Sequence, residues 1–342
     1  MKLIWIPATT LSLLRMARAV SPSTTRSALD IDTVVEDGQT PSALDADLAR
    51  VMLEPMKLVH DRLLAESVRP EEFWDSLFQD VMAESTDAPL TTATLEIAVI
   101  RGGGSHLNSD QIAGTLHRHF QTCRQAIAEK FPRQSDQLKL RYAPLKQAYQ
   151  AYGPGLIRSI GHRIWNAAPP DDWWPKTVYL HAVQPLHRGD GDVSTIDSAL
   201  WIEAVLTDIN PDVPEWLRLV YLLTCVAVDG HARTHQTSAT PAEAIAAAAG
   251  LTSATSSMPE LPWRLGTIPL VLHQAFEQGV LGNGDDKLPI ELAASMWWSA
   301  ASSGAPKSSV ALTWLPTWWR EIGQHAGSLP PALKQLSVML AS

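Results

Sequence analysis

The stretch PEWLRLVYLLTCVAVD, residues 214–229, constrains the fold more than any other segment of this chain. When its residues are placed at helical intervals of 100°, apolar side chains fall on every side, and Arg218 is its one basic residue. A helix that is apolar all round is stable only where other elements cover it completely. The stretch therefore predicts a central, buried helix over 214–228.

Helical periodicity dominates the rest of the chain and predicts a mainly α fold. The other expected helices cover 42–66 with a break at Pro55, 70–84, 109–128, 132–165 with a break at Gly153–Gly155, 195–209, 240–249, 262–278, 288–301, 308–325 and 331–341. Two segments, 94–101 and 177–184, are rich in β-branched residues and are the strand candidates. We therefore expect a multi-helix globular bundle with at most a small two- or three-stranded β element.

The length of 342 residues fits one large domain or two ordinary ones. Residues 20–41 are rich in Ser, Thr and Asp without a sustained period, so we expect a flexible lead-in over 1–41 and order from Ser42. The Pro169–Asp172 joint is the expected boundary between helical parts at 42–170 and 171–342. Pairing of the two strand candidates would fuse these parts into one domain.

Composition and charge narrow the classes of function. A chain with 45% hydrophobic and 18% charged residues is globular, and a net charge of −9 argues against nucleic acid as a partner. No apolar run is long enough for a transmembrane segment. Cys123 and Cys225 lie in apolar, helix-like stretches, which is typical of free buried cysteines in a soluble cytoplasmic protein.

The first twenty residues leave export open as an alternative location. An apolar run broken by Pro7 precedes Ala17-Arg18-Ala19, which imitates the cleavage site of a secretory signal. Arg15 and Arg18 stand where such a signal is usually uncharged, so any export would use an atypical signal.

Glu203 is the most unusual polar residue in the pattern. On the helix expected over 195–209 it falls inside the apolar arc, and a carboxylate that faces a core is costly unless it is paired or protonated. One interpretation is a buried ion pair with Arg218 of the central helix. The other is a catalytic general base or a metal ligand whose pKa is raised by burial.

The loop that precedes Glu203 supplies the groups for the second interpretation. The stretch HAVQPLHRGDGD contains His181, His187, Asp190 and Asp192, and we expect His187 and the two aspartates to be the metal ligands if a divalent metal binds. A metal-assisted hydrolase would then use His187, Asp190 and Asp192 beside a catalytic Glu203.

This loop does not match a known metal motif. Asp190-x-Asp192-x-Ser194 begins like a calcium loop, but Thr195 stands where the turn needs glycine and Trp201 where the bidentate glutamate should be, which excludes an EF-hand. An irregular site with oxygen or mixed histidine and carboxylate ligands stays open.

Three further features have ordinary structural explanations. His231 and His235 are four residues apart but lack the glutamate of a zinc helix, so we expect an exposed connector. The glycines at 102–104 follow a strand candidate without a phosphate-loop motif, which indicates a turn. Thirteen tryptophans, against five Phe and five Tyr, are expected mainly in the core, with a partner surface as the alternative.

The stretches AYGPGLIRSIG, LHAVQPLHRGDGD and DSALWIEAVLTDINPDVPEWLRLVYLL resemble a group of mainly helical bacterial proteins seen in planctomycetes. The resemblance covers the middle third of the chain. It implies a helical fold and no activity, and the charged residues Arg188, Asp190 and Asp192 depart from the more glycine-rich loop of that group.

Two functions follow from these patterns. The first is a soluble helical protein that acts by binding a partner or by self-association, without a cofactor. The alternative is the metal-assisted hydrolase built on the region from His181 to Glu203. Convergence of the loop side chains on Glu203 in a cleft would favour the enzyme.

Overall fold

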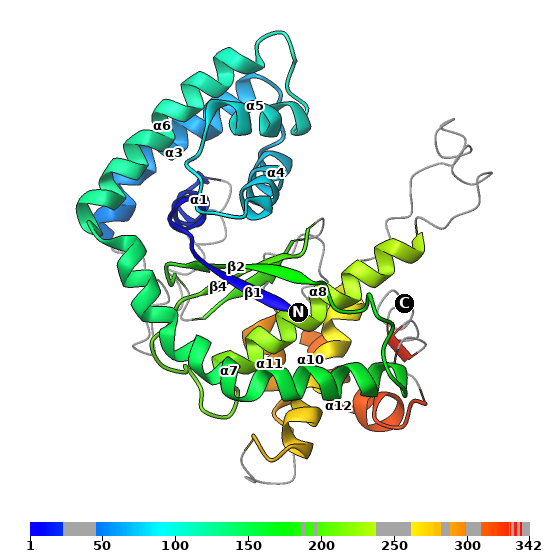
Figure 1. Ribbon diagram of the computed structural model, residues 1–342. Helices are drawn as coiled ribbons and strands as arrows, with labels where there is room; N and C mark the ends of the chain where they lie inside the picture. Colours follow the sequence, from blue (N-terminus) through cyan, green and yellow to red (C-terminus); the bar gives the residue numbers. More distant parts are fainter. Residues whose placement is uncertain are drawn as a thin grey trace, which may run out of the picture.

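The computed structural model describes residues 1–22, 46–186, 189–194, 197–236, 261–281, 288–298, 309–327, 329, 332, 333 and 336 (Figure 1). Its helices are α1 Thr9–Ala19, α3 Ala46–Ala65, α4 Pro70–Ala83, α5 Thr92–Arg101, α6 Ser109–Lys130, α7 Gln134–Trp165, α8 Glu215–Gln236, α10 Leu261–Glu277, α11 Ile290–Trp297, α12 Ser309–Trp318 and the π-helix η2 Trp319–Gly323. Its strands are β1 Lys2–Pro7, β2 Thr177–Val183, β3 Gly191–Val193 and β4 Ala199–Glu203. The mainly α prediction is thus confirmed.

One mixed sheet lies at the centre of the molecule, in the order β1-β2-β4-β3. β1, β2 and β4 are parallel, and β3 runs antiparallel beside β4. The expected limit of two or three strands is wrong because three of the four strands, β1, β3 and β4, were not recognised in the sequence. β1 lies in the predicted lead-in, and β3 has only three residues.

Side chains alternate between the two faces of the sheet along each strand, and each face packs against its own layer of helices. Val178, Leu180, Leu200 and Ile202 belong to the larger core, which includes α7, α8 and α10. Residues of the opposite face, among them Val183 and Trp201, pack with α1 and the end of α4. In Figure 1, α1 and α3–α6 lie above the sheet and α7, α8 and α10–α12 below it.

The N-terminal segment is part of this fold. Ordered structure begins with β1 and α1, and α1 buries eight of its residues between the upper helices and the sheet, so the expectation that order begins near Ser42 is wrong. Residues 23–45 lie outside the described part. The proposed domain boundary at 169–172 stays a prediction.

The strand candidate at 94–101 is helix α5 instead. Thr91 accepts a hydrogen bond from the Thr94 N–H at 3.1 Å and caps the helix start, and Leu95, Ala98 and Val99 are fully buried on one face. Short apolar runs fit either type of structure by periodicity alone, and here packing against α4 and α6 selects the helix. The glycines at 102–104 consequently follow a helix.

The segment expected as a helix over 195–209 contains strand β4. All five residues of β4 are buried, because β2 and β3 pair with its two edges and helices cover both faces. A strand buried on both faces lacks the polar and apolar alternation that identifies strands in a sequence.

Other helix predictions fared differently. The breaks expected at Pro55 and at 153–155 are wrong, since α3 and α7 continue through these positions. Strand β2 and the central helix α8 are confirmed, and every residue of α8 from 215 to 228 is buried. The helix expected over 240–249 lies outside the described residues.

Candidate functional site

The candidate site lies around β3 and the adjoining end of β4, where loops leave the carboxyl ends of the parallel strands. Ligands of open α/β sheets commonly bind at such an edge. Two clusters of charged side chains meet there. The Arg15 cluster consists of Arg15, Asp190 and Glu203, and the Arg264 cluster consists of Asp192, Asp229 and Arg264.

The Arg15 cluster joins α1 to the central sheet. Arg15 Nη2 lies 2.8 Å from Glu203 Oε1 and 3.3 Å from Asp190 Oδ2. The guanidinium also lies 3.9 Å from the ring centroid of Trp201, which adds a cation–π contact. The side chain of Glu203 has no exposed surface, and that of Arg15 has 6%. The two charges are therefore neutralised inside the protein and not by water.

Glu203 is held by the main chain as well. The Leu186 N–H donates to Oε1 and the Gly189 N–H to Oε2, each at 2.8 Å. Burial alone would raise the pKa of Glu203, but Arg15 and the two N–H donors outweigh burial and hold the pKa below its ordinary value. Both carboxylate oxygens are thus engaged, and this geometry supports a structural role. The catalytic role of Glu203 stays a prediction.

The ion pair expected between Glu203 and Arg218 is wrong, because Arg218 faces Glu215 on its own helix, with 3.4 Å between Nη1 and Oε2. Both side chains are almost completely buried. Within the described residues, the carboxylate oxygens of Glu215 and the guanidinium nitrogens of Arg218 have no hydrogen-bond partner. Burial, only partly opposed by Arg218, raises the pKa of Glu215 to about 7.

Gly189 allows the loop to approach this pair. Its φ of +104° lies in the region that favours glycine, and an added Cβ would lie 2.8 Å from Glu215 Oε1 and 2.9 Å from Arg218 Nη1. The same residue donates its N–H to Glu203. The loop therefore separates Glu203 from the pair that Arg218 forms.

The raised pKa of Glu215 predicts a pH-dependent stability. Between its ordinary value of 4.5 and about 7 the folded protein binds this proton more tightly than the unfolded chain, so stability falls as the pH rises through this window. We expect a loss on the order of 3 kcal/mol from this group. Denaturant titrations from pH 4 to 8 should show that Glu215→Gln removes this part of the slope and that the exposed control Glu291→Gln keeps it. Equal slopes in the wild type and Glu215→Gln would contradict the assignment.

The Arg264 cluster joins β3 to the helices α8 and α10. Arg264 Nη1 donates to Asp192 Oδ1 at 3.1 Å, and Nε and Nη2 donate to Asp229 Oδ2 at 3.1 and 2.7 Å. The Val193 N–H also donates to Asp192 Oδ1. Burial is the main cause that raises the pKa of Asp192, and the negative charges of Asp190 and Asp229 act in the same direction. Arg264 and the Val193 N–H oppose them.

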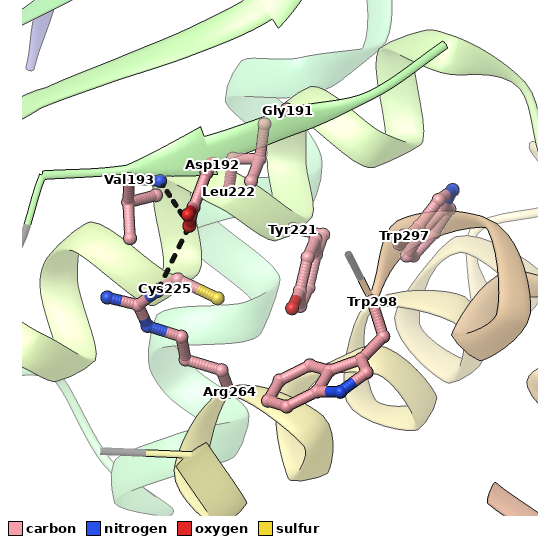
Figure 2. A pocket seen from close by; sticks show the side chains of 9 residues that line it. All are labelled: Gly191, Asp192, Val193, Tyr221, Leu222, Cys225, Arg264, Trp297 and Trp298. Carbon is pink, nitrogen blue, oxygen red and sulfur yellow. Dashed lines mark hydrogen bonds and ion pairs between the residues drawn. The ribbon is translucent and has the colours of Figure 1, made fainter. Parts of the chain in front are cut away.

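A pocket opens beside this cluster, which we call the Tyr221 pocket (Figure 2). The pocket together with its open mouth measures about 260 Å³, whereas its enclosed part is about 10 Å³, roughly the room for one water molecule. Its lining consists of Gly191, Asp192, Val193, Tyr221, Leu222, Cys225, Arg264, Trp297 and Trp298. In Figure 2 the rings of Tyr221 and Trp297 lie side by side, and Trp298 and Arg264 line the same pocket. The pocket therefore combines aromatic walls with a charged wall.

Tyr221 and Cys225 are neutral parts of this lining. Burial raises the pKa of the Cys225 thiol to about 12 and that of the Tyr221 hydroxyl well above its ordinary value. The thiol lies 3.6 Å from Thr267 Oγ1. A thiol that stays protonated is a poor nucleophile, so Cys225 contributes shape and not reactivity.

Among the described loop residues chosen from the sequence, only Asp190 joins Glu203, through their shared contact with Arg15. Asp190 and Asp192 bind different arginines, and His181 lies within the sheet with Nε2 3.0 Å from the Met82 carbonyl oxygen. Among the described residues no three His, Cys, Asp or Glu side chains are grouped as metal ligands, but His187 is not among those residues. The assignment of His187, Asp190 and Asp192 to a divalent metal stays a prediction.

His231 differs from the exposed connector expected for it. It continues α8, is half-buried, and its ring contacts Trp165 and Trp173, with centroids 4.9 and 5.3 Å away. Sequence reasoning also missed Arg264 and Tyr221 as site residues, because they come from two separate helices, and it considered Trp298 only as part of a partner surface. The only available signal was an arginine or an aromatic ring within an otherwise apolar helix.

No helix within the described ranges is long and apolar enough to cross a membrane. Comparisons with protein-family models, with curated proteins and with solved structures each returned no match. The resemblance to helical planctomycete proteins therefore stays a prediction, as does the cellular location.

Proposed function

We propose that this protein is a binding protein that takes a small organic molecule into the Tyr221 pocket. The observation that carries the proposal is the pocket itself, in which aromatic rings and a charged cluster face the same space. Small-molecule sites typically combine an apolar, aromatic lining with a few fixed polar groups. Self-association or a protein partner, the other forms of a binding role, stay predictions.

The pocket is built on rigid elements. Tyr221 and Cys225 belong to the buried part of α8, and Tyr221 stacks on Trp297 of α11 with ring centroids 5.4 Å apart. Arg264 belongs to α10, and its ion pairs fix Asp192 of β3 against α8 and α10. Side chains held in this way lose little conformational freedom when a ligand binds, which favours affinity.

Trp298 provides a reporter for this function. It is half-buried at the end of α11 and lines the pocket, so its ring will sense an occupant. We expect addition of benzylamine, benzyl alcohol or benzoate to shift the ¹⁹F resonance of Trp298 in protein labelled with 5-fluorotryptophan. Replacement of Trp298 with Phe assigns that resonance among the thirteen tryptophans.

Trp314 is the matched control, because it is 54% exposed on α12 and does not line the pocket. Its resonance should stay fixed while that of Trp298 moves and saturates. If the Trp298 resonance does not respond to any of the three probes, the binding proposal fails. Equal shifts at Trp298 and Trp314 would indicate non-specific contact and would also count against it.

A further inference from the structure

We infer that the Tyr221 pocket selects a primary ammonium group, so that its ligand is a small organic amine. The inference rests on the proposed binding function and names the chemical class of the ligand. Three properties of the lining carry it: the balance of charge, the aromatic walls and a carboxylate oxygen without a donor.

The charge balance of the Arg264 cluster, which borders the pocket, is negative. Asp192 and Asp229 share the single guanidinium of Arg264, so the ionised cluster has one negative charge in excess. Each of the three Arg264 nitrogens already donates to a carboxylate, which leaves the cation poorly placed to attract an anionic ligand. Asp190 adds a further negative charge near Asp192. A cation in the pocket would therefore be attracted and an anion repelled.

The aromatic walls favour the same sign of charge. Tyr221 and Trp297 stack on each other and are almost fully buried, which leaves the half-buried Trp298 as the ring that can contact a cation at the mouth of the pocket. Ammonium groups are commonly recognised by aromatic side chains combined with a carboxylate. Trp298 is only half-buried, so its ring can contact a ligand that enters through the open mouth.

A primary ammonium group also finds a hydrogen-bond acceptor. Within the described residues Asp192 receives its hydrogen bonds, from the Val193 N–H and from Arg264, on Oδ1 alone. Its side chain is 31% exposed, so Oδ2 is available to a donor from a ligand. Charge-assisted hydrogen bonds of this kind are about twice as strong as neutral ones.

The test compares three probes of nearly equal shape at neutral pH: benzylamine, benzyl alcohol and benzoate. Titrations followed at the Trp298 resonance should show that benzylamine binds at least about tenfold more tightly than benzyl alcohol, with benzoate weakest. In the Asp192→Asn variant, which keeps the Oδ1 acceptor, benzylamine should bind no more tightly than benzyl alcohol. The exposed control Asp212→Asn should keep the preference.

A second variant covers the case in which Asp192→Asn does not fold. Trp298→Leu changes a half-buried residue, and calorimetric titration should show that it weakens benzylamine about two- to fivefold more than benzyl alcohol. If benzyl alcohol or benzoate binds as tightly as benzylamine, the amine inference fails while the binding function stands. If none of the probes binds, both fail.

Discussion

Replacement of Glu203 or Arg15 with alanine should each lower the free energy of unfolding by about 3 to 5 kcal/mol. Either change leaves the other charge buried without its partner, since the two side chains are 0% and 6% exposed and lie 2.8 Å apart. Loss of Glu203 also leaves the N–H groups of Leu186 and Gly189 without an acceptor. Urea or guanidinium titration of the single variants measures both effects.

A double-mutant cycle separates this pair from general loss of packing. We expect the combined Arg15→Met and Glu203→Leu variant to recover much of the loss, because apolar groups of similar volume need no partner. Arg50 and Asp47, an ion pair whose side chains are 77% and 80% exposed, form the control and should couple by less than about 1 kcal/mol. Stronger coupling of Glu203 to Arg218 than to Arg15 would contradict the assignment.

Replacement of Leu223 with alanine should cost about 2 to 5 kcal/mol of stability. Leu223 is completely buried in α8, which packs against α7, α10 and the strands β3 and β4, so the lost methyl groups leave a cavity that several elements surround. Leu140→Ala on α7 is the matched control, because that leucine is 71% exposed. Its effect should stay within about 0.5 kcal/mol. An equally small effect at Leu223 would show that α8 is peripheral.

Part of the candidate site could be predicted from the sequence. A glutamate within the apolar run ALWIEAVL was expected to be buried and to need a partner, and both properties are observed. The identity of the partner could not be predicted from local sequence patterns, because Arg15 is 188 positions from Glu203. The two residues pair only when β1 joins the sheet beside β2. Arg15 instead suggested an atypical signal segment.

The Tyr221 pocket could not be predicted from the sequence for the same reason. Asp192 drew attention through its neighbours in the loop, and these suggested a metal site. Its actual neighbour in space, Arg264, is 72 positions away on α10, and Trp298 lies directly after α11. A pocket formed by separate elements leaves no spacing in the sequence, so its chemistry becomes visible only when the elements have packed.

The sequence by itself determined the helical class and the central position of α8, because amphipathic period and an apolar surface on every side are local properties of a chain. It did not determine whether ALWIE forms a helix or a strand. The residues of that short apolar run are compatible with either structure. It forms a strand because β2 and β3 form hydrogen bonds with its two edges. The tertiary structure likewise decided which arginine neutralises Glu203, because a buried charge pairs with the group that packing brings within a few ångströms, whatever its distance along the chain.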